Sequence, residues 1–581
     1  MAVDILMESH IAFLDKHLGE KGQCEYSWAN SKNIQELLVQ LNFQIVRDTN
    51  EDKIIKLENV QREILDGLMF RLEQGTISFV DFQEWIVLNY KLVAYTRDII
   101  CGKGEYTLAY MLVNVWFEYF PELAKFMLKS FVVFDDEKHP LGSWKDLKHF
   151  CNYCLECGYK RDYPMIKYAY DLIIEQLKQD VLKTRNEDLS LVAKWIPREK
   201  SKRFGWIFNE LAVLYFNNYI QSTNDYEKRA KAILKCKTDF RVLIAGLNKR
   251  LGTIQIHQCS KEWAKIDYNK ITSITFSKQS KALFNLTQDG TMRYPLNDRI
   301  KCSNNAIMHV YEHLRKPQSE IRGKRISVSE FMKRAIELLQ NINSNQNEYD
   351  LLNLQWKDFL SQINPLGPMI PMVDLSESMN GEAYYNAIGL ACIIASKSAI
   401  KQRVMTFSAF SEWHNLEDCP ELIDMVRRLM NANCGMNSDF YGALDKILNV
   451  FVEPDISCHT MNDTTIVVLS DMQIHSLPLT DKKMASFYET IYHKYQSLNK
   501  KYKPPHILFW NLRSTAGFPT LSIQYNASMV SGYNPIILNS LAKKGGFNSH
   551  DTCNPWFMLK KQLNISRYNV LGETVKTILN K

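Results

Sequence analysis

Short apolar segments that end in polar residues most constrain the fold of this chain. Residues 369–374, 404–408, 465–471 and 506–511 are such segments, and helical patterns separate them. Short apolar runs bounded by turn-forming residues are typical of buried parallel strands. Strands that alternate with helices form a parallel sheet covered on both faces. Residues 366–581 are therefore predicted to form a doubly wound α/β domain with a C-terminal helical extension.

The first of these segments ends in an Asp-x-Ser-x-Ser sequence formed by Asp374, Ser376 and Ser378. One carboxylate and two hydroxyls at this spacing can converge on a hard cation such as Mg²⁺ or Mn²⁺. Asp471 ends another predicted strand, and open α/β sheets bind ligands at the carboxyl ends of their strands. These residues predict a metal site. The alternative is that Asp374 and Asp471 only cap loops.

The rest of the chain is predicted to be all-α. Helical periodicity indicates an N-terminal helical extension at residues 1–95 and a helical-repeat-like region at residues 96–340. Helices joined by short polar turns are typical of a HEAT-like array, although no fixed-period repeat is visible. Residues 341–365 are predicted to form a linker and a short helix.

Several segments in order resemble one family. They are Gly-Lys-Gly-Glu (102–105), Gly-Ser-Trp-Lys-Asp-Leu (142–147), Leu-Val-Ala-Lys-Trp-Ile-Pro (191–197), Trp-Ala-Lys-Ile-Asp-Tyr (263–268), Asp-Leu-Ser-Glu-Ser-Met (374–379), Ser-Asp-Met (470–472), Phe-Trp-Asn-Leu-Arg (509–513) and Val-Ser-Gly-Tyr (530–533). Together they resemble an uncharacterised family of plants, fungi and large DNA viruses, whose members join a helical region to a von Willebrand A-like domain. The resemblance covers residues 95–581.

The resemblance implies a metal-ion-dependent adhesion site that binds Mg²⁺ or Mn²⁺. In this sequence its residues would be Asp374, Ser376, Ser378, Ser438 and Asp471. It implies that hydroxyls bind the metal directly, that at least one carboxylate binds it through water, and that one position stays open for an acidic group of a protein partner. The sequence departs from the family at Glu377, where glycine is usual, and this carboxylate would shield the open position.

The same two-part plan resembles the Ro ribonucleoprotein, in which a helical-repeat ring binds RNA and carries a von Willebrand A-like domain. The architectural resemblance implies that the helical region binds RNA. A basic segment could contact phosphates, and its candidate residues are Arg315, Lys316, Arg322, Lys324 and Arg325. The alternative is an ordinary solvated face of a helix and loop.

These observations favour a non-catalytic binding scaffold that holds a protein partner through the metal and binds protein or RNA through the helical region. The alternative function is a metal-dependent hydrolase acting on phosphoesters. The sequence contains neither a Gly-x-Ser-x-Gly nucleophile elbow nor a His-Glu-x-x-His zinc motif. A site built mainly from hydroxyls leaves the ion electrophilic, which suits binding an anionic group.

Composition predicts an intracellular, cytoplasmic protein, located in the host cytoplasm or the virion if the chain is viral. The 13 cysteines lack framework spacing, which favours a reducing compartment. The acidic N-terminus has no signal-peptide pattern. No apolar run approaches the roughly 18 residues that would span a bilayer, so no membrane is expected. The net charge of +7 is modest for 581 residues and does not by itself indicate nucleic acid.

Overall fold

The structure is a computed structural model, and all structural statements concern the residues that it describes. These are residues 16–19, 23–47, 50–134, 139–221, 225–315, 323–341, 345–400, 402–432, 439–452, 464–473, 487–498, 505–541 and 553–580.

A six-stranded sheet forms the centre of the C-terminal part. Its strands lie in the order β5-β4-β3-β6-β7-β8. In chain order they are β3 (Met369–Asp374), β4 (Arg403–Phe407), β5 (Ser411–Asn415), β6 (Thr465–Ser470), β7 (His506–Asn511) and β8 (Ala527–Ser531). All neighbouring strands are parallel except β4 and β5. The predicted α/β sheet is confirmed, but it is mixed, and the sequence patterns did not indicate β5 or β8.

Alternating side chains of the strands face opposite layers of helices. Val373, Val467 and Leu508 lie in one buried cluster with helices on one face, whereas Met372 and Val468 lie in the cluster on the other face. The helices of this part are α18 (Glu382–Lys397), α19 (Leu422–Met430), α20 (Phe440–Val452), α22 (Phe487–Leu498), α23 (Ile537–Leu541), α24 (Pro555–Leu563) and α25 (Asn569–Leu579), with the short 3₁₀ turns η4 (Glu377–Met379) and η5 (Ser566–Tyr568). The period of two along each strand therefore places one hydrophobic set on each face.

The N-terminal part is helical apart from a small hairpin of β1 (Lys16–Leu18) and β2 (Cys24–Tyr26). Its helices are α2 (Ile34–Gln44), α3 (Glu51–Glu73), α4 (Phe79–Arg97), α5 (Thr107–Tyr119), α6 (Pro121–Ser130), α7 (Lys145–Glu156), α8 (Pro164–Leu182), α9 (Val192–Trp195), α10 (Gly205–Tyr215), α11 (Asn217–Gln221), α12 (Tyr226–Leu251), α13 (Ile254–Cys259), α14 (Ser273–Leu283), α15 (Asn297–Arg315), α16 (Val328–Gln340) and α17 (Gln346–Ser361), with the turns η1 (Asn186–Asp188), η2 (Trp263–Lys265) and η3 (Tyr268–Lys270). The predicted helical region is confirmed, and a HEAT-like repeat stays a prediction.

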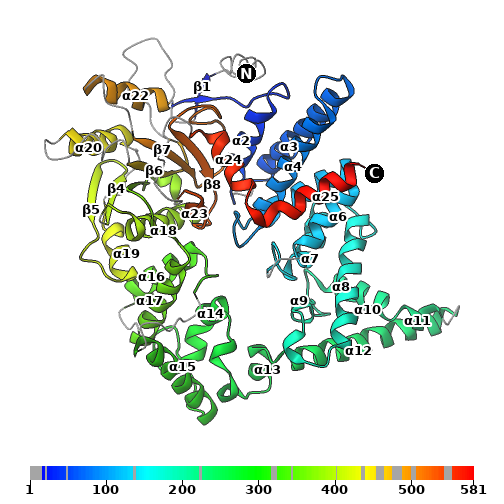
Figure 1. Ribbon diagram of the computed structural model, residues 1–581. Coiled ribbons are helices and arrows are strands. Elements are labelled where there is room, and N and C mark those ends of the chain that lie inside the picture. The colour runs from blue at the N-terminus through cyan, green and yellow to red at the C-terminus, as the bar shows by residue number, and fades with distance from the viewer. Residues whose placement is uncertain are drawn as a thin grey trace.

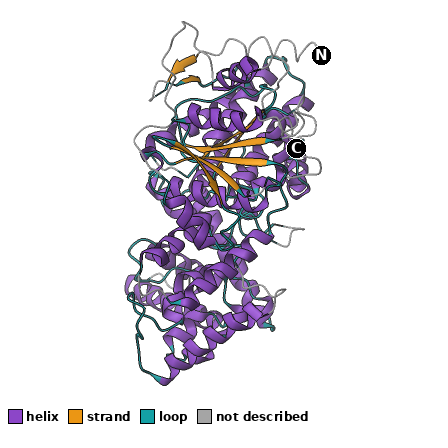
Figure 2. Cartoon of the chain, turned by 90° about the vertical axis from the view of Figure 1, so that its left-hand side faces the viewer, coloured by secondary structure: helices purple, strands orange, loops and turns teal. Residues whose placement is uncertain are grey.

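The elements follow a closed circuit (Figure 1). From the sheet the chain passes through α2–α4, descends along α5–α12 and returns through α13–α17 to α18. Seen from the side, the sheet lies in the upper half of the molecule and the helices of the return path lie below it (Figure 2). The helical region therefore starts and ends against the sheet.

Residues 23–105 and 505–580 meet in an extensive contact, called here the joint. Tyr26 and Phe518 exchange backbone hydrogen bonds of 2.9 and 3.1 Å. The helices α2 and α24 pack on β8, and α25 packs on α4. The buried cluster on this face of the sheet continues into the helical region without interruption. No feature of residues 1–95 alone indicated this docking.

The joint buries charged groups that are hydrogen-bonded across it. Arg567 donates from Nε to Asp98 Oδ2 over 2.9 Å, and the Tyr568 hydroxyl donates to the same oxygen over 2.9 Å. Lys103, from the Gly-Lys-Gly sequence, donates to the carbonyls of Asn42 and Ile45 and to Ser531 Oγ. This lysine links the end of α2 to β8 and is structural.

Candidate functional site

The carboxyl end of β3 lies where the strand order changes direction. From β3 the chain adds β4 and β5 on one side, and β6, β7 and β8 on the other. Asp374 ends β3, and Asp471 directly follows β6, the neighbour of β3. Ligands of open α/β sheets bind in the crevice at such a switch point. Both acids predicted from the sequence are therefore at the expected edge.

Asp374 is fully buried and hydrogen-bonded on both oxygens. The Ser376 backbone N–H donates to Oδ1 over 2.9 Å, and Ser470 Oγ donates to Oδ2 over 2.7 Å. Burial, and then the neighbouring Asp471 carboxylate, raise the pKa of Asp374 to about 6. Two carboxylates at one buried edge disfavour each other's charge, and a cation between them would remove that cost.

The hydroxyl residues converge beside these acids. Ser376 Oγ and Ser378 Oγ are 3.0 Å apart, and Ser378 lies in the turn η4. The Arg513 guanidinium donates to the Ser378 carbonyl over 2.6 Å, which ties this loop to the end of β7. Asp471 Oδ1 accepts from the Gln473 N–H over 3.1 Å. The residues that directly follow β3 and β6 are thus both held by local hydrogen bonds.

Ser438, the predicted second-loop residue, lies outside the described residues. The next residue, Asp439, is described, and its N–H donates to the carbonyl of Ser408 over 2.6 Å. Ser408 directly follows β4, the other neighbour of β3. Asp439 Oδ1 accepts from the Gly442 N–H over 3.0 Å at the start of α20. Asp439, the residue after Ser438, therefore lies at the same edge of the sheet as Asp374.

The donor set fits a hard divalent cation. It offers two buried carboxylates and two hydroxyls, all of them oxygen donors of the kind that Mg²⁺ and Mn²⁺ take. No group of three or more His, Cys, Asp or Glu side chains suited to a metal occurs among the described residues. A metal at this edge would therefore depend on the serine hydroxyls as well as on the acids.

Ser470 is a member of the site that the sequence analysis missed. It is the last residue of β6, and its Oγ holds one Asp374 oxygen and accepts from the Met472 N–H over 3.0 Å. Its position at the end of a predicted strand, directly before Asp471, could have identified it from the sequence. Glu377 is exposed on η4, beside the two predicted serine ligands.

The five residues predicted to contact nucleic acid do not form a single surface among the described residues. Arg315 ends α15 and is exposed, whereas Lys316 and Arg322 lie outside the described residues. Lys324 Nζ is 3.5 Å from an Asp358 carboxylate oxygen. Arg325 donates to the carbonyl of Ile99 over 3.4 Å. Phosphate binding by this segment stays a prediction.

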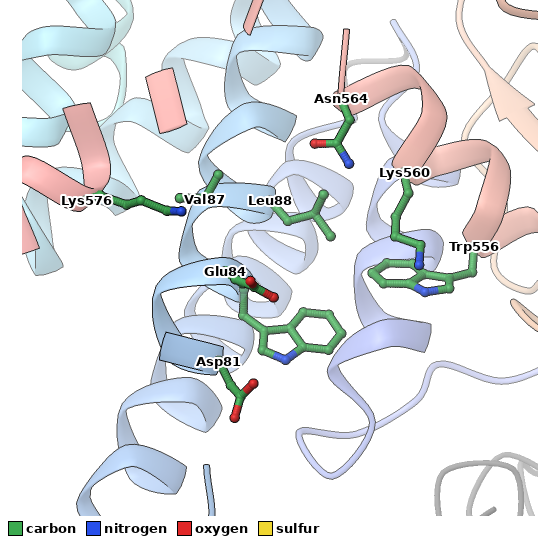
Figure 3. A pocket seen from close by; sticks show the side chains of 9 residues that line it. Asp81, Glu84, Val87, Leu88, Trp556, Lys560, Asn564 and Lys576 are labelled. Carbon is green, nitrogen blue, oxygen red and sulfur yellow. The ribbon is translucent and has the colours of Figure 1, made fainter. Parts of the chain in front are cut away.

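A pocket of about 350 Å³ lies in the joint, away from the sheet edge (Figure 3). Trp85 of α4 and Trp556 of α24 stack across it with centroids 5.5 Å apart. Its lining mixes acids of α4 with Lys560 and Lys576 of the C-terminal helices. Stacked rings and a mixture of acidic and basic side chains are typical of a contact between packed helices, so we interpret this pocket as part of the joint and not as a ligand site.

No helix of the described residues is both long and apolar enough to cross a membrane.

Comparisons with known proteins divide the chain at β3. Residues 369–570 match a family described as "Domain of unknown function (DUF7788)", and residues 166–369 match one described as "Domain of unknown function (DUF2828)". The chain is also similar to "Uncharacterized protein L728" of Acanthamoeba polyphaga mimivirus, with 22% identity over 480 residues that cover 79% of this chain and 77% of that protein. These matches support the resemblance to an uncharacterised family with members in large DNA viruses.

Proposed function

We propose that this protein is a non-catalytic binding scaffold whose sheet domain binds an acidic group of a protein partner through Mg²⁺ or Mn²⁺ at the Asp374 edge. One observation carries the proposal: Asp374, Asp471, Ser376 and Ser378 meet where the strand order of the sheet changes direction. The resemblance to the von Willebrand A-like adhesion site singles out the same residues, with Ser438 as the fifth.

The chemistry of the donors supports binding over catalysis. A divalent cation here would offset the two neighbouring carboxylates, while neutral hydroxyls would leave it enough positive charge to attract a further acidic oxygen. Phosphoester hydrolysis would also need a general base within hydrogen-bond reach. In the sheet, His506 begins β7 at the opposite edge, and the His414 ring is bonded to Thr406 over 2.9 Å. His475, four residues after Asp471, is a further candidate base and lies outside the described residues. The hydroxyl-rich set of donors is therefore the observation that favours binding over catalysis.

Calorimetric titration of Mg²⁺ and Mn²⁺ into the full chain tests the proposal. Asp374→Asn keeps the shape of the side chain and an oxygen acceptor, and Ser376→Ala removes one hydroxyl. Both variants are expected to lose at least tenfold in metal affinity. Asp424→Asn, on the surface of α19, is the matched control and should bind as the wild type does. Equal affinity in all four proteins would rule out the site.

Glu377 provides a second test. If its exposed carboxylate shields the open position, Glu377→Ala should bind a glutamate-containing peptide more tightly in the presence of Mg²⁺, and chelator should abolish the gain. An unchanged affinity would show that Glu377 does not shield the ion.

The helical region is proposed to bind protein or RNA, as the architectural resemblance to Ro implies. This part of the proposal is independent of the metal, so a metal-binding variant should leave it intact.

A further inference from the structure

A tryptophan surrounded by cations lies on the helical region. Trp195, at the end of α9, has three lysine ammonium groups around its ring: Lys148 at 4.9 Å, Lys194 at 5.7 Å and Lys145 at 5.9 Å from the centroid. Lys148 is also 5.6 Å from the centre of the Phe204 ring. These five residues are called here the Trp195 cluster.

Tertiary packing builds this cluster from three separate segments. Lys145 and Lys148 are three residues apart on α7 and so share one face of the helix. The short helix α9 packs against α7 and brings Lys194 and Trp195 to that face. Phe204 directly precedes α10. In Figure 1, α7 and α9 lie on the inner side of the helical circuit, with α8 and α10 outside them.

No acid of the described residues neutralises the three lysines. None of their ammonium groups lies within 4.0 Å of a carboxylate in the described ranges. Asp146, on the same helix, is buried and bonded to Arg97 through two contacts of 2.7 Å. Glu156 pairs with Arg203 over 3.0 Å. The nearby acids are thus already engaged with other cations.

Burial first, and neighbouring positive charge second, lower the pKa of two groups at the cluster. Partial burial, and then Lys145, lower the pKa of Lys148 to about 8. Burial, and then Lys145 and Lys148, lower the pKa of the neighbouring His149 to about 4. Repulsion of this kind opposes folding, and a bound anion would relieve it.

Side-chain packing alone does not explain why three lysines lie around the Trp195 ring. A lysine above an aromatic ring at an exposed site contributes about 0.5–1 kcal/mol, and one such contact needs no ligand. Three ammonium groups around one ring also repel one another. Trp195 remains partly exposed, so its ring is available to a ligand.

We propose that the Trp195 cluster binds single-stranded nucleic acid, with the lysines contacting phosphates and the Trp195 ring stacking on a base. Each nucleotide supplies both an anion and a flat ring, whereas an acidic peptide supplies only the anion. The 315–325 segment is rich in cations but poor in aromatic residues, so this cluster is the better candidate. The inference rests on the proposed RNA binding of the helical region and not on the metal site.

Fluorescence anisotropy of labelled twelve-nucleotide oligo(U) and oligo(dT), titrated with the full chain at several salt concentrations, tests the proposal. The triple variant Lys145→Gln, Lys148→Gln, Lys194→Gln should bind at least tenfold more weakly at about 100 mM salt. The slope of log affinity against log salt should become shallower by about 2, because each phosphate contact on a single strand contributes about 0.7.

The matched control removes the same charge from another helix of the same region. Lys228, Lys231 and Lys235 are exposed on α12, and changing all three to Gln should leave affinity and slope within about twofold of the wild type. Trp195→Leu keeps an apolar side chain but no ring. It should weaken binding about tenfold with the salt slope unchanged, since stacking is not an ionic contact.

Three outcomes count against the proposal. Undetectable binding by the folded wild type at low salt, or an equal loss in the α12 control, would overturn it. Equal affinity for a twelve-residue polyglutamate would indicate an acidic protein partner instead. Thermal melting of every variant checks folding. If RNA alone binds and DNA does not, the ribose hydroxyl is part of the recognition.

Discussion

The joint and the Asp374 edge both bury charge, but they arrange it in opposite ways. In the joint, Arg567 faces Asp98, and Lys103 donates to three oxygens. At the edge, Asp374 lies beside a second acid, Asp471. A buried charge that has an oppositely charged partner in the protein needs no ligand to offset it. Two buried charges of the same sign need a ligand of opposite sign to offset their repulsion, and such pairs mark candidate binding sites.

The Trp195 cluster follows the pattern of the edge with the opposite sign. Its lysines gather around one ring while the neighbouring acids Asp146 and Glu156 bind arginines elsewhere. The two proposed sites are thus identified by the same physical criterion, one for a cation and one for an anion.

The largest expected effect tests the matched charges of the joint. Arg567→Ala would leave the buried Asp98 carboxylate without its cation and the carbonyls of His139 and Pro140 without a donor. Breaking a buried pair from one side costs about 3–5 kcal/mol. Chemical denaturation should show a loss of this size. Arg428→Ala, which breaks an exposed pair with Asp418, is the control and should change stability far less.

Glu36 is a buried acid of the joint for which no ion pair is seen among the described residues, and its titration makes the stability of the joint depend on pH. It is fully buried on α2, accepts from the Ser522 N–H over 2.9 Å, and burial raises its pKa from 4.5 to about 7. Its folded pKa is raised, so its contribution to stability is complete below pH 4.5 and is lost as pH rises through 7.

The Glu36→Gln variant should remove that dependence. Gln keeps an oxygen acceptor for Ser522 and carries no charge, so at pH 8 it should be more stable than wild type by up to about 3 kcal/mol. Denaturation midpoints of both proteins between pH 4.5 and 8 measure the effect. Parallel curves would show that the pKa of Glu36 does not differ between the folded and unfolded states.

Asp374→Asn should sharpen the contrast between the joint and the edge. In chelator at pH 8 the variant should be more stable than the wild type by up to about 3 kcal/mol, because a buried carboxylate beside Asp471 is replaced by a neutral amide. Saturating Mg²⁺ should stabilise the wild type and not the variant. If the variant is instead less stable in chelator, Asp374 belongs with the matched charges of the joint.

The strands that alternate with helices could be predicted from the sequence. Features that depend on contacts between segments distant in the chain could not. The pattern at 506–511 matches β7, and Asp374 and Asp471 lie at strand ends, since a buried parallel strand is apolar along its whole length. The strand β5 has Trp413 as its one apolar residue and lies at the margin of the sheet, so it gives no such run. The Trp195 cluster is formed from three segments that packing alone brings together, and no local pattern marks it.

The smallest expected effect is a rise in Tm when oligo(U) binds to the Trp195 cluster. A ligand that binds only the folded state stabilises it according to its concentration relative to Kd, by about 1.4 kcal/mol at ten times Kd. For a protein of this size that corresponds to a rise in Tm of about 1–3 °C.

Oligo(U) at ten times the wild-type Kd should produce this rise in the wild type and in the α12 control, and at most about a third of it in the triple lysine variant at the same concentration. Mg²⁺ should raise the Tm of all three proteins, because the acids of the edge are intact in each of them. An equal rise with oligo(U) in the triple variant and the wild type would place the nucleic acid elsewhere on the molecule, with the 315–325 segment as the next candidate.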